Sequence, residues 1–520
     1  MTLGRRPADR SLFRSSAELV KDKLGERSIF ALLAREGDRI FPDEMFADLF
    51  RGIGRRSVSP RIVVTVMVLQ RFEGLSDREA VERFTFDVRW KFAAGALDLD
   101  HPSFVHTVLV DMRERLRRSE RPNRVFEIVL EVAKQCGLVG RKRVLDSTAL
   151  YDAVATQDTV TMVRSGIRGV LRAADETLST ELRGVLKRDD DYVSAGKPTC
   201  DWDDTEARER LVDALARDAF AVLAQLDNRA LQPAVAEATK LLATVAGQDI
   251  EETDGVFRIA IRVAKDRTIS TVDPEARHGH KTESRGFDGF KGHIAIDPDS
   301  EIVTATSVTP GNVGDADAAK DLLDEALAPA VSSTEPITVY GDASYGSADL
   351  VEHVEESGAV PMMKVQSAPA KPGMYSQVDF KIDIGAATVT CPAGNLVQLR
   401  PMKEGYRAQF GTRCGACSLR SKCTTSKDGR LINLHAKHET LARMRAKQKT
   451  PAFAKAYKAT RPKVERKIAH MMRRRHGGRR ARVRGRQRIG HDFALLAASV
   501  NLSRIATLAC TIPTREVSAG

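Results

Sequence analysis

Three acidic residues have the type and placement needed for metal-assisted chemistry. Asp146 ends the apolar segment VLD, Asp342 ends TVYGD, and Glu465 lies in the basic segment KVERKIAHM. Each residue alone is most simply a strand-end, turn or surface residue, because Asp and Gly are common where strands end. Together they match the oxygen ligands that Mg²⁺ (or Mn²⁺) prefers. Two such ions can activate a water or a 3′-hydroxyl for phosphoryl transfer.

A second group of candidates is basic. Residues 473–488, RRRHGGRRARVRGRQR, contain nine arginines and no acidic residue, in a chain of 520 residues with net charge +12. Arginine suits phosphate because its planar fork donates two parallel hydrogen bonds and stays charged. The alternative is a solvated basic tail. We expect DNA contacts from five of these arginines, namely Arg473, Arg474, Arg475, Arg479 and Arg480.

Cysteines form a third group. Four of the seven lie close together in the sequence, at Cys391, Cys414, Cys417 and Cys423. Tetrahedral thiolate coordination predicts a structural Zn²⁺ site, and a loose group of reduced thiols is the alternative. The odd total favours a reducing compartment over a disulfide framework.

The elements that must position these residues form a mixed α/β pattern. Segments 290–297 and 301–309 read as a β-hairpin with Asp297 in its turn. A helix then precedes the strand that ends at Asp342, and another helix and strand follow. The segment 457–472 reads as one helix whose apolar stripe lies beside Glu465. Arg461, four residues earlier, can reach Glu465 on the same side.

Several function classes have no support in the sequence. It contains no GxxxxGK[ST] loop, no HExxH segment and no convincing dinucleotide fingerprint, which argues against ATP-driven and zinc-peptidase chemistry. The N-terminus lacks the apolar core of a signal peptide, and the apolar run at 62–69 is too short to span a bilayer. We therefore expect a cytosolic protein without a membrane partner.

The order of these motifs resembles a family, the DDE transposases of bacterial insertion sequences, and the likeness covers most of the chain. Supporting motifs near the N-terminus are EGLSDREAVERF and FDVRWKFAAG. The residues that carry the resemblance are VLDSTALYDAVATQDTV (144–160), DPEARHGHKTESRGFDGFKGHIAID (273–297), TPGNVGDADAA (309–319), VYGDASYGS (339–347) and YKATRPKVERKIAHMMRRR (457–475).

The resemblance implies a ribonuclease-H-like mixed sheet and assigns Asp146, Asp342 and Glu465 as the metal-binding catalytic residues. It also implies that Tyr457, Arg461 and Arg473 surround the glutamate and contact the DNA. The expected partners are double-stranded DNA, as terminal inverted repeats and target, and a second copy of the chain on that DNA. A bacterial, nucleoid-associated location would follow. Two alternatives stay open: a related nuclease that does not join strands, and a non-catalytic DNA-binding relic.

The expected organisation is an α/β core interrupted by insertions. It comprises a helical DNA-binding domain at 1–135, which is either a plain bundle or includes a helix-turn-helix, and a catalytic core at 141–152 and 266–370. A helical insertion at 153–265, without a sheet, separates the two parts of the core. A β-rich, Cys-containing insertion follows at 371–435, and C-terminal helices with the basic run complete the core at 436–512.

Overall fold

The computed structural model describes residues 15–20, 22–153, 156–282, 284–328, 335–368 and 371–509. Residues 1–14, in the predicted helical domain, and 510–512, at the end of the predicted C-terminal helices, lie outside the described residues. Among those that are described, no helix is both long and apolar enough to cross a membrane.

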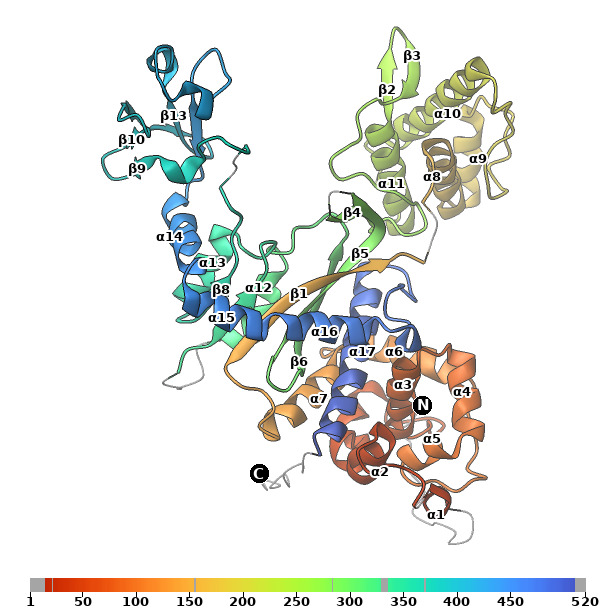
Figure 1. Ribbon diagram of the computed structural model, residues 1–520. Coiled ribbons are helices and arrows are strands. Elements are labelled where there is room, and N and C mark those ends of the chain that lie inside the picture. Colours follow the sequence, from red (N-terminus) through yellow and green to blue (C-terminus); the bar gives the residue numbers. More distant parts are fainter. Residues whose placement is uncertain are drawn as a thin grey trace.

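A mixed six-stranded sheet lies at the centre of the molecule (Figure 1). β5 pairs antiparallel with β1, β4 and β6, whereas β7 runs parallel to both β1 and β8. The strand order is therefore β6–β5–β1–β7–β8, with β4 also on β5. The strands are β1 (Lys142–Tyr151), β4 (Arg277–Thr282), β5 (Arg285–Ile296), β6 (Val303–Pro310), β7 (Thr338–Gly341) and β8 (Val360–Met363).

The predicted hairpin is confirmed as β5 and β6. Asp297 closes it, since its Oδ1 accepts hydrogen bonds from the backbone N–H groups of Asp299 (2.9 Å) and Ser300 (2.8 Å). Helices α12 (Ala319–Leu327) and α13 (Ala348–Glu356) also lie where the sequence predicts them.

Alternating side chains of the sheet supply two hydrophobic cores. Leu145 and Ala295 pack with α12 and α13 on one face. Val144 and Ile294 pack on the opposite face with the N-terminal helices and with α17 (Arg486–Thr507). Because strand side chains alternate between faces, Asp146 points to the same side as Val144.

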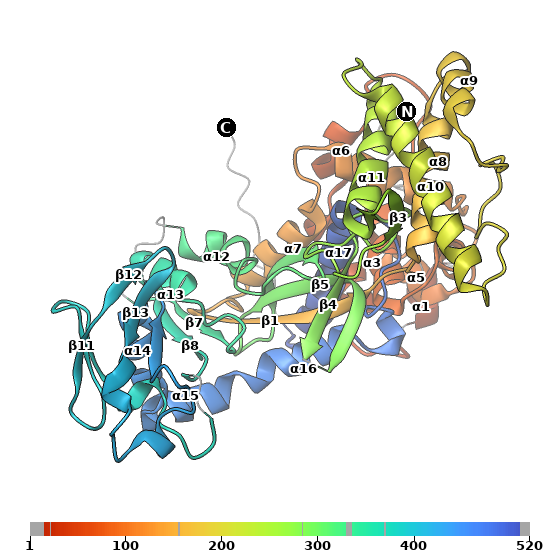
Figure 2. The same cartoon turned by 90° about the horizontal axis from the view of Figure 1, so that it is seen from above.

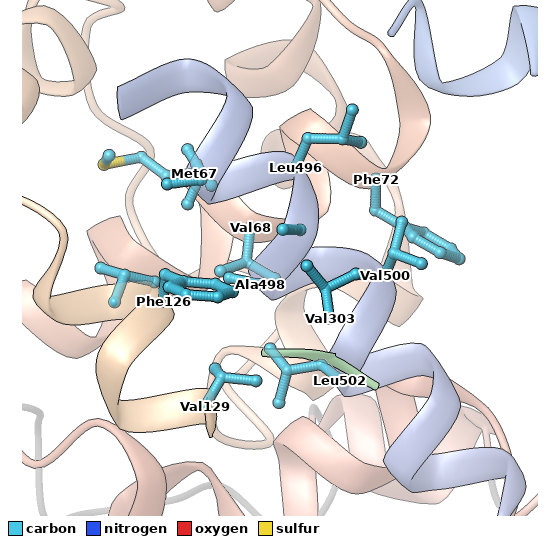
Figure 3. Packing of buried hydrophobic residues seen from close by; sticks show 14 of the residues in the cluster. Met67, Val68, Phe72, Phe126, Val129, Val303, Leu496, Ala498, Val500 and Leu502 are labelled. Carbon is cyan, nitrogen blue, oxygen red and sulfur yellow. The ribbon is translucent and has the colours of Figure 1, made fainter. Parts of the chain in front are cut away.

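The N-terminal helices and α17 share one continuous core with the sheet. α17 is apolar on nearly all sides and contacts α2, α3, α7 and β6, and its Leu496, Ala498, Val500 and Leu502 appear in Figure 3. A helix that is apolar all round is stable only when surrounded. The N-terminal elements are α1 (Ser16–Val20), α2 (Ile29–Ile40), η1 (Asp43–Leu49), α3 (Pro60–Glu73), α4 (Asp77–Phe86), α5 (Val88–Ala93), α6 (Thr107–Arg118) and α7 (Arg124–Gln135).

The segment 153–265 has its own hydrophobic core and projects from one side of the sheet (Figures 1 and 2). It contains α8 (Thr159–Ala173), α9 (Glu176–Val185), α10 (Thr205–Leu226) and α11 (Pro233–Asp249). The expectation of helices without a sheet is wrong at its end, where β2 (Ile250–Thr253) pairs with β3 (Val256–Ile259). The turn is Asp254–Gly255, both with positive φ (54° and 75°), which is a strong hairpin signal.

Residues 371–435 are β-rich, as predicted, and project from the other side of the central sheet (Figures 1 and 2). They form two small antiparallel sheets. Their elements are η2 (Gln377–Asp379), β9 (Lys381–Asp383), β10 (Thr388–Thr390), β11 (Leu396–Gln398), β12 (Arg400–Met402), β13 (Gly405–Gln409), η3 (Gly411–Cys414), η4 (Arg420–Lys422) and β14 (Leu431–Leu434).

The chain then returns to the core through α14 (His438–Gln448), α15 (Pro451–Thr460), α16 (Pro462–Met471) and η5 (Arg474–His476). The prediction of one helix over 457–472 is wrong, because α15 ends before Arg461 and a new helix begins at Pro462. Proline lacks the N–H needed to continue a helix and suits its first turn.

Asn501 ties α17 to the sheet and provides a test of this packing. Its side chain accepts from the Val303 N–H and donates to the Val303 C=O, both at 2.8 Å, and the side chain is fully buried. Asn501→Ala leaves both backbone groups without partners. We expect a loss of about 2–4 kcal/mol in the free energy of unfolding.

Urea denaturation measures this change. Thr507→Ala is the matched control, because its hydroxyl is exposed and bonds only within α17. An Asn501→Ala protein as stable as the control would contradict this role.

Candidate active site

The two predicted aspartates lie on neighbouring parallel strands. Val144 of β1 pairs with Tyr340 of β7. Continuing that register by two residues brings Asp146 level with Asp342, with both side chains on the same face. β7 ends at Gly341, so Asp342 is the first residue beyond the strand, where its carboxylate is partly exposed to solvent.

Arg461 joins these carboxylates and Glu465 through one guanidinium group. Its two terminal nitrogens contact the two oxygens of Asp146 at 3.0 and 3.1 Å, in a bidentate pair. The nitrogen nearer Asp146 Oδ1 also lies 3.4 Å from Asp342 Oδ2, and the other lies 3.5 Å from Glu465 Oε1. The three residues predicted as catalytic are therefore brought together, although they come from three distant parts of the sequence.

Exposure rises across this group of carboxylates. The side chain of Asp146 is 14% exposed, that of Asp342 is 40% exposed and that of Glu465 is 64% exposed. Glu465 lies in the first turn of α16, beside the buried Val464 and Ile468, and its own side chain is exposed. The carboxylate on β1 is therefore shielded from solvent, whereas the carboxylate on α16 is accessible to it.

Burial raises the pKa of the Asp146 carboxyl, and the charge of Arg461 opposes that rise. Arg461 itself is buried, and its Nε has no hydrogen-bond partner among the described residues. The predicted DNA contact of Arg461 is therefore occupied here by an internal ion pair.

Tyr457 closes the side of the site next to β7. Its hydroxyl donates to the Gly341 carbonyl at 3.3 Å, and its ring stacks on Phe453. The Lys364 ammonium lies 4.6 Å from the centre of the Tyr457 ring. Tyr457 thus fixes the end of β7 next to Asp342, and Lys364 adds positive charge beside it.

Sequence reasoning missed a polar network on the opposite face of β1. Asp315 accepts from the Ser147 hydroxyl at 2.7 Å and from the Lys291 ammonium at 2.9 Å. His293 is fully buried and contacts Thr309 Oγ1 at 2.9 Å, and burial lowers its pKa to about 4. A lysine within a core strand needs an anion nearby, and that requirement was the available signal for Asp315.

The basic segment is built into the fold and is not a free tail. The Tyr151 N–H donates to the Arg479 carbonyl at 3.0 Å, and the Ala481 N–H donates to the Tyr151 carbonyl at 2.8 Å. Residues 479–481 therefore add to the end of β1, the strand that carries Asp146. The five predicted DNA-binding arginines, Arg473, Arg474, Arg475, Arg479 and Arg480, all remain exposed.

The four clustered cysteines line one small pocket, and all are free thiols. Burial raises the pKa of the Cys423 thiol, while the charge of Arg430 opposes the rise. The Arg430 N–H donates to Cys414 Sγ at 3.4 Å. In their present side-chain conformations, the described residues include no group of three or more His, Cys, Asp or Glu placed to hold a metal ion.

The three carboxylates nonetheless supply the kind of ligand that divalent cations such as Mg²⁺ bind. They offer only oxygen donors, and a single positively charged group already bridges both aspartates. A hard cation could take over that bridging role if Arg461 moved away.

The raised pKa of Asp146 predicts how stability depends on pH. Its folded-state pKa lies above the unfolded value near 3.9, so ionisation of Asp146 disfavours the folded state as pH rises through that interval. Replacing the carboxyl with an amide removes this cost. We expect the melting temperature of the metal-free Asp146→Asn variant, relative to wild type, to be higher at pH 7 than at pH 3.5, on top of a constant cost from the lost Arg461 ion pair.

Thermal unfolding in EDTA across this range checks the prediction. A relative melting temperature that falls as the pH rises would contradict the assignment. Asp299→Asn is the control, because Asp299 is exposed and its pKa is lowered by its hydrogen bond to Lys142.

Two family models match separate segments of the chain. Residues 390–506, which include Glu465, match a family model described as "Transposase DDE domain". Residues 21–115, in the N-terminal helices, match another described as "Transposase domain (DUF772)". No curated protein and no solved structure matches the chain. The two matched segments both belong to transposase families and indicate an insertion-sequence DDE transposase.

Proposed function

We propose that this transposase binds the terminal inverted repeats of its element, cleaves the DNA there and joins the freed ends to target DNA. The observation that carries the proposal is the convergence of Asp146, Asp342 and Glu465 on one guanidinium. Asp146 lies within β1, and Asp342 lies just beyond the parallel strand β7. Carboxylates grouped in this way repel one another unless a cation lies among them. A site that binds metal ions for phosphoryl transfer has that property.

The strand arrangement supports a ribonuclease-H-like core. An antiparallel β6–β5–β1 meander followed by parallel β7 and β8 gives the expected mixed sheet, with Asp146 on its central strand. The two insertions leave this sheet from opposite sides, so both can lie beside DNA without interrupting the site (Figure 2).

Asp146, Asp342 and Glu465 would hold Mg²⁺ or Mn²⁺, which lowers the pKa of a bound water or 3′-hydroxyl and stabilises the leaving oxygen. The chain's own residues position the DNA. Arg461, once released from the aspartates, offers a planar fork to a backbone phosphate. Lys364 adds a second cation beside Tyr457, on the side of β7.

The arginine segment would hold the backbone beyond the site. Residues 479–481 pair with Tyr151, five residues after Asp146, which places Arg480 about 17 Å along β1 from the aspartate. Phosphates of a strand passing the carboxylates would meet these arginines next. Action on two element ends favours a homodimer assembled on DNA.

Substitution of the carboxylates tests the proposal. Asp342→Asn and Glu465→Gln keep the side-chain shape and remove a metal-binding charge, so we expect cleavage of element-end DNA to fall at least about 100-fold. Binding of the same duplex should persist, because the arginines are unchanged. Asp299→Asn, which alters an exposed partner of Lys463 on α16, is the matched control.

The measurement is a gel assay of cleavage and strand joining with Mg²⁺, alongside binding by anisotropy. Full activity in either variant would overturn the catalytic assignment. Cleavage without joining in the wild type would identify the nuclease alternative, and binding without cleavage would identify the relic.

We further propose that Cys391, Cys414, Cys417 and Cys423 hold a structural Zn²⁺. The support is their placement around one pocket from three separate stretches of chain. The thiols would have to turn toward one another, and thiolate coordination would then cross-link two small sheets that share a hydrophobic core of nine buried residues.

Metal analysis of the purified full chain tests the zinc proposal. We expect about one zinc per chain, lost in Cys414→Ser with Cys417→Ser and kept in Cys136→Ser with Cys200→Ser. The zinc-deficient variant should also unfold at a lower temperature. Wild-type protein without zinc, or zinc that survives the first pair of substitutions, would overturn the site.

A further inference from the structure

The loop between η1 and α3 displays an unusual surface. It has the sequence RGIGRRS, residues 51–57, and its first six residues are all exposed. Ile53 at its apex is 88% exposed. The sequence contains no acidic residue from position 50 to position 72. A large apolar side chain is therefore exposed to solvent in a segment whose charged residues are all basic.

Both ends of this loop are firmly anchored. Asp43 accepts hydrogen bonds from the Ser59 hydroxyl at 2.7 Å and from the Arg61 N–H at 2.9 Å. At the other end, Arg115 donates to the Leu49 carbonyl at 2.7 Å, and its guanidinium lies 4.9 Å from the centre of the Phe50 ring. The backbone on both sides of the loop is therefore fixed, and Ile53 lies at the exposed tip between these two anchors.

The arginines of the loop are uncompensated. Within the part of the chain that the structure describes, the side chains of Arg51, Arg55 and Arg56 make no hydrogen bond or ion pair. Two other exposed arginines of the N-terminal region are paired with glutamates. Arg39 pairs with Glu36, and Arg121 pairs with Glu127. Three unpaired like charges on one short loop favour a polyanion.

We infer that loop 51–57 is a DNA-contacting element that enters the minor groove of the element end. The inference rests on the proposed function only in taking duplex DNA as the partner. Arginine side chains are attracted to the negative potential of a narrow minor groove. Gly52 and Gly54 flank Ile53 and carry no side chain, so the backbone can approach the groove, and Gly54 has a φ of 123°. Ile53 is then an apolar wedge against a base step.

The position of the loop suggests where on the DNA it acts. Helix α3 has 14 residues and is about 21 Å long. The loop precedes its first residue, whereas Gly74 at its other end packs against the backbone of Arg475. A separation of about 21 Å corresponds to roughly 6 base pairs. The loop would therefore touch DNA inside the terminal repeat, away from the cleaved bond.

The test compares two variants of the full chain that lose the same charge. The loop variant carries Arg51→Gln, Arg55→Gln and Arg56→Gln. The control carries Arg35→Gln, Arg39→Gln and Arg121→Gln, which removes arginines that are exposed but paired with glutamates. The probe is a labelled, A·T-rich duplex of about three helical turns, and binding is followed by anisotropy at several salt concentrations.

We expect the loop variant to bind at least about tenfold more weakly, with the salt slope of log K reduced by about 2–3, while the control changes little. Netropsin, which occupies the minor groove, should weaken wild-type binding strongly and the loop variant only slightly. Ile53→Ser should lower affinity without changing the salt slope, because no charge is lost. Unchanged melting temperatures confirm that each variant is folded.

Three results would overturn the inference in distinguishable ways. If the wild type binds DNA and the loop variant binds equally well with the same salt slope, the loop has no such role and the proposed transposition chemistry is unaffected. If netropsin has no effect on the wild type, the minor-groove assignment is wrong. If the wild type does not bind DNA at all, the proposed function fails together with the inference.

Discussion

The contact between the Arg461 guanidinium and three carboxylates is the constraint on which the candidate site depends. Asp146 is nearly buried, and a buried carboxylate without a cation is costly. Arg461 supplies that cation from the junction between α15 and α16 and reaches Asp342 and Glu465 as well. The C-terminal part of the chain must therefore return across the sheet before the site can form.

The rest of the fold secures this return. α16 packs on β1, residues 479–481 extend the edge of β1, and α17 fills the space between the N-terminal helices and the sheet (Figure 3). On the other face, Asp315 holds Ser147 next to Asp146 through a hydrogen bond of 2.7 Å. The strand that carries Asp146 is thus fixed from both sides, while Glu465 remains exposed at the open side.

Local sequence patterns were enough to predict much of this arrangement. The alternating residues around 290–309 predicted two strands, and the turn residues after Asp342 predicted the end of a strand. Both predictions were possible because strand periodicity and turn chemistry are local properties of the sequence. The β2–β3 hairpin carried an equally local signal, Asp254–Gly255, that was overlooked. The helix break at Arg461 was also readable from Pro462. The inward position of Arg461 depends on Asp146, which is 315 residues away in the sequence, so no pattern near Arg461 could reveal it. For the network around Asp315, the one available signal was Lys291, a charged residue within a core strand.

The central claim is that Asp146, Asp342 and Glu465 share one metal-binding site. Iron(II) bound in place of Mg²⁺ reduces added hydrogen peroxide to hydroxide and a hydroxyl radical, and the radical cuts the backbone only near the metal. The cuts therefore report the location of the metal without requiring activity. The account predicts cuts clustered around residues 146, 342 and 465, suppressed by excess Mg²⁺ and by Asp146→Asn. Cuts confined to other segments, or unaffected by that substitution, would contradict it.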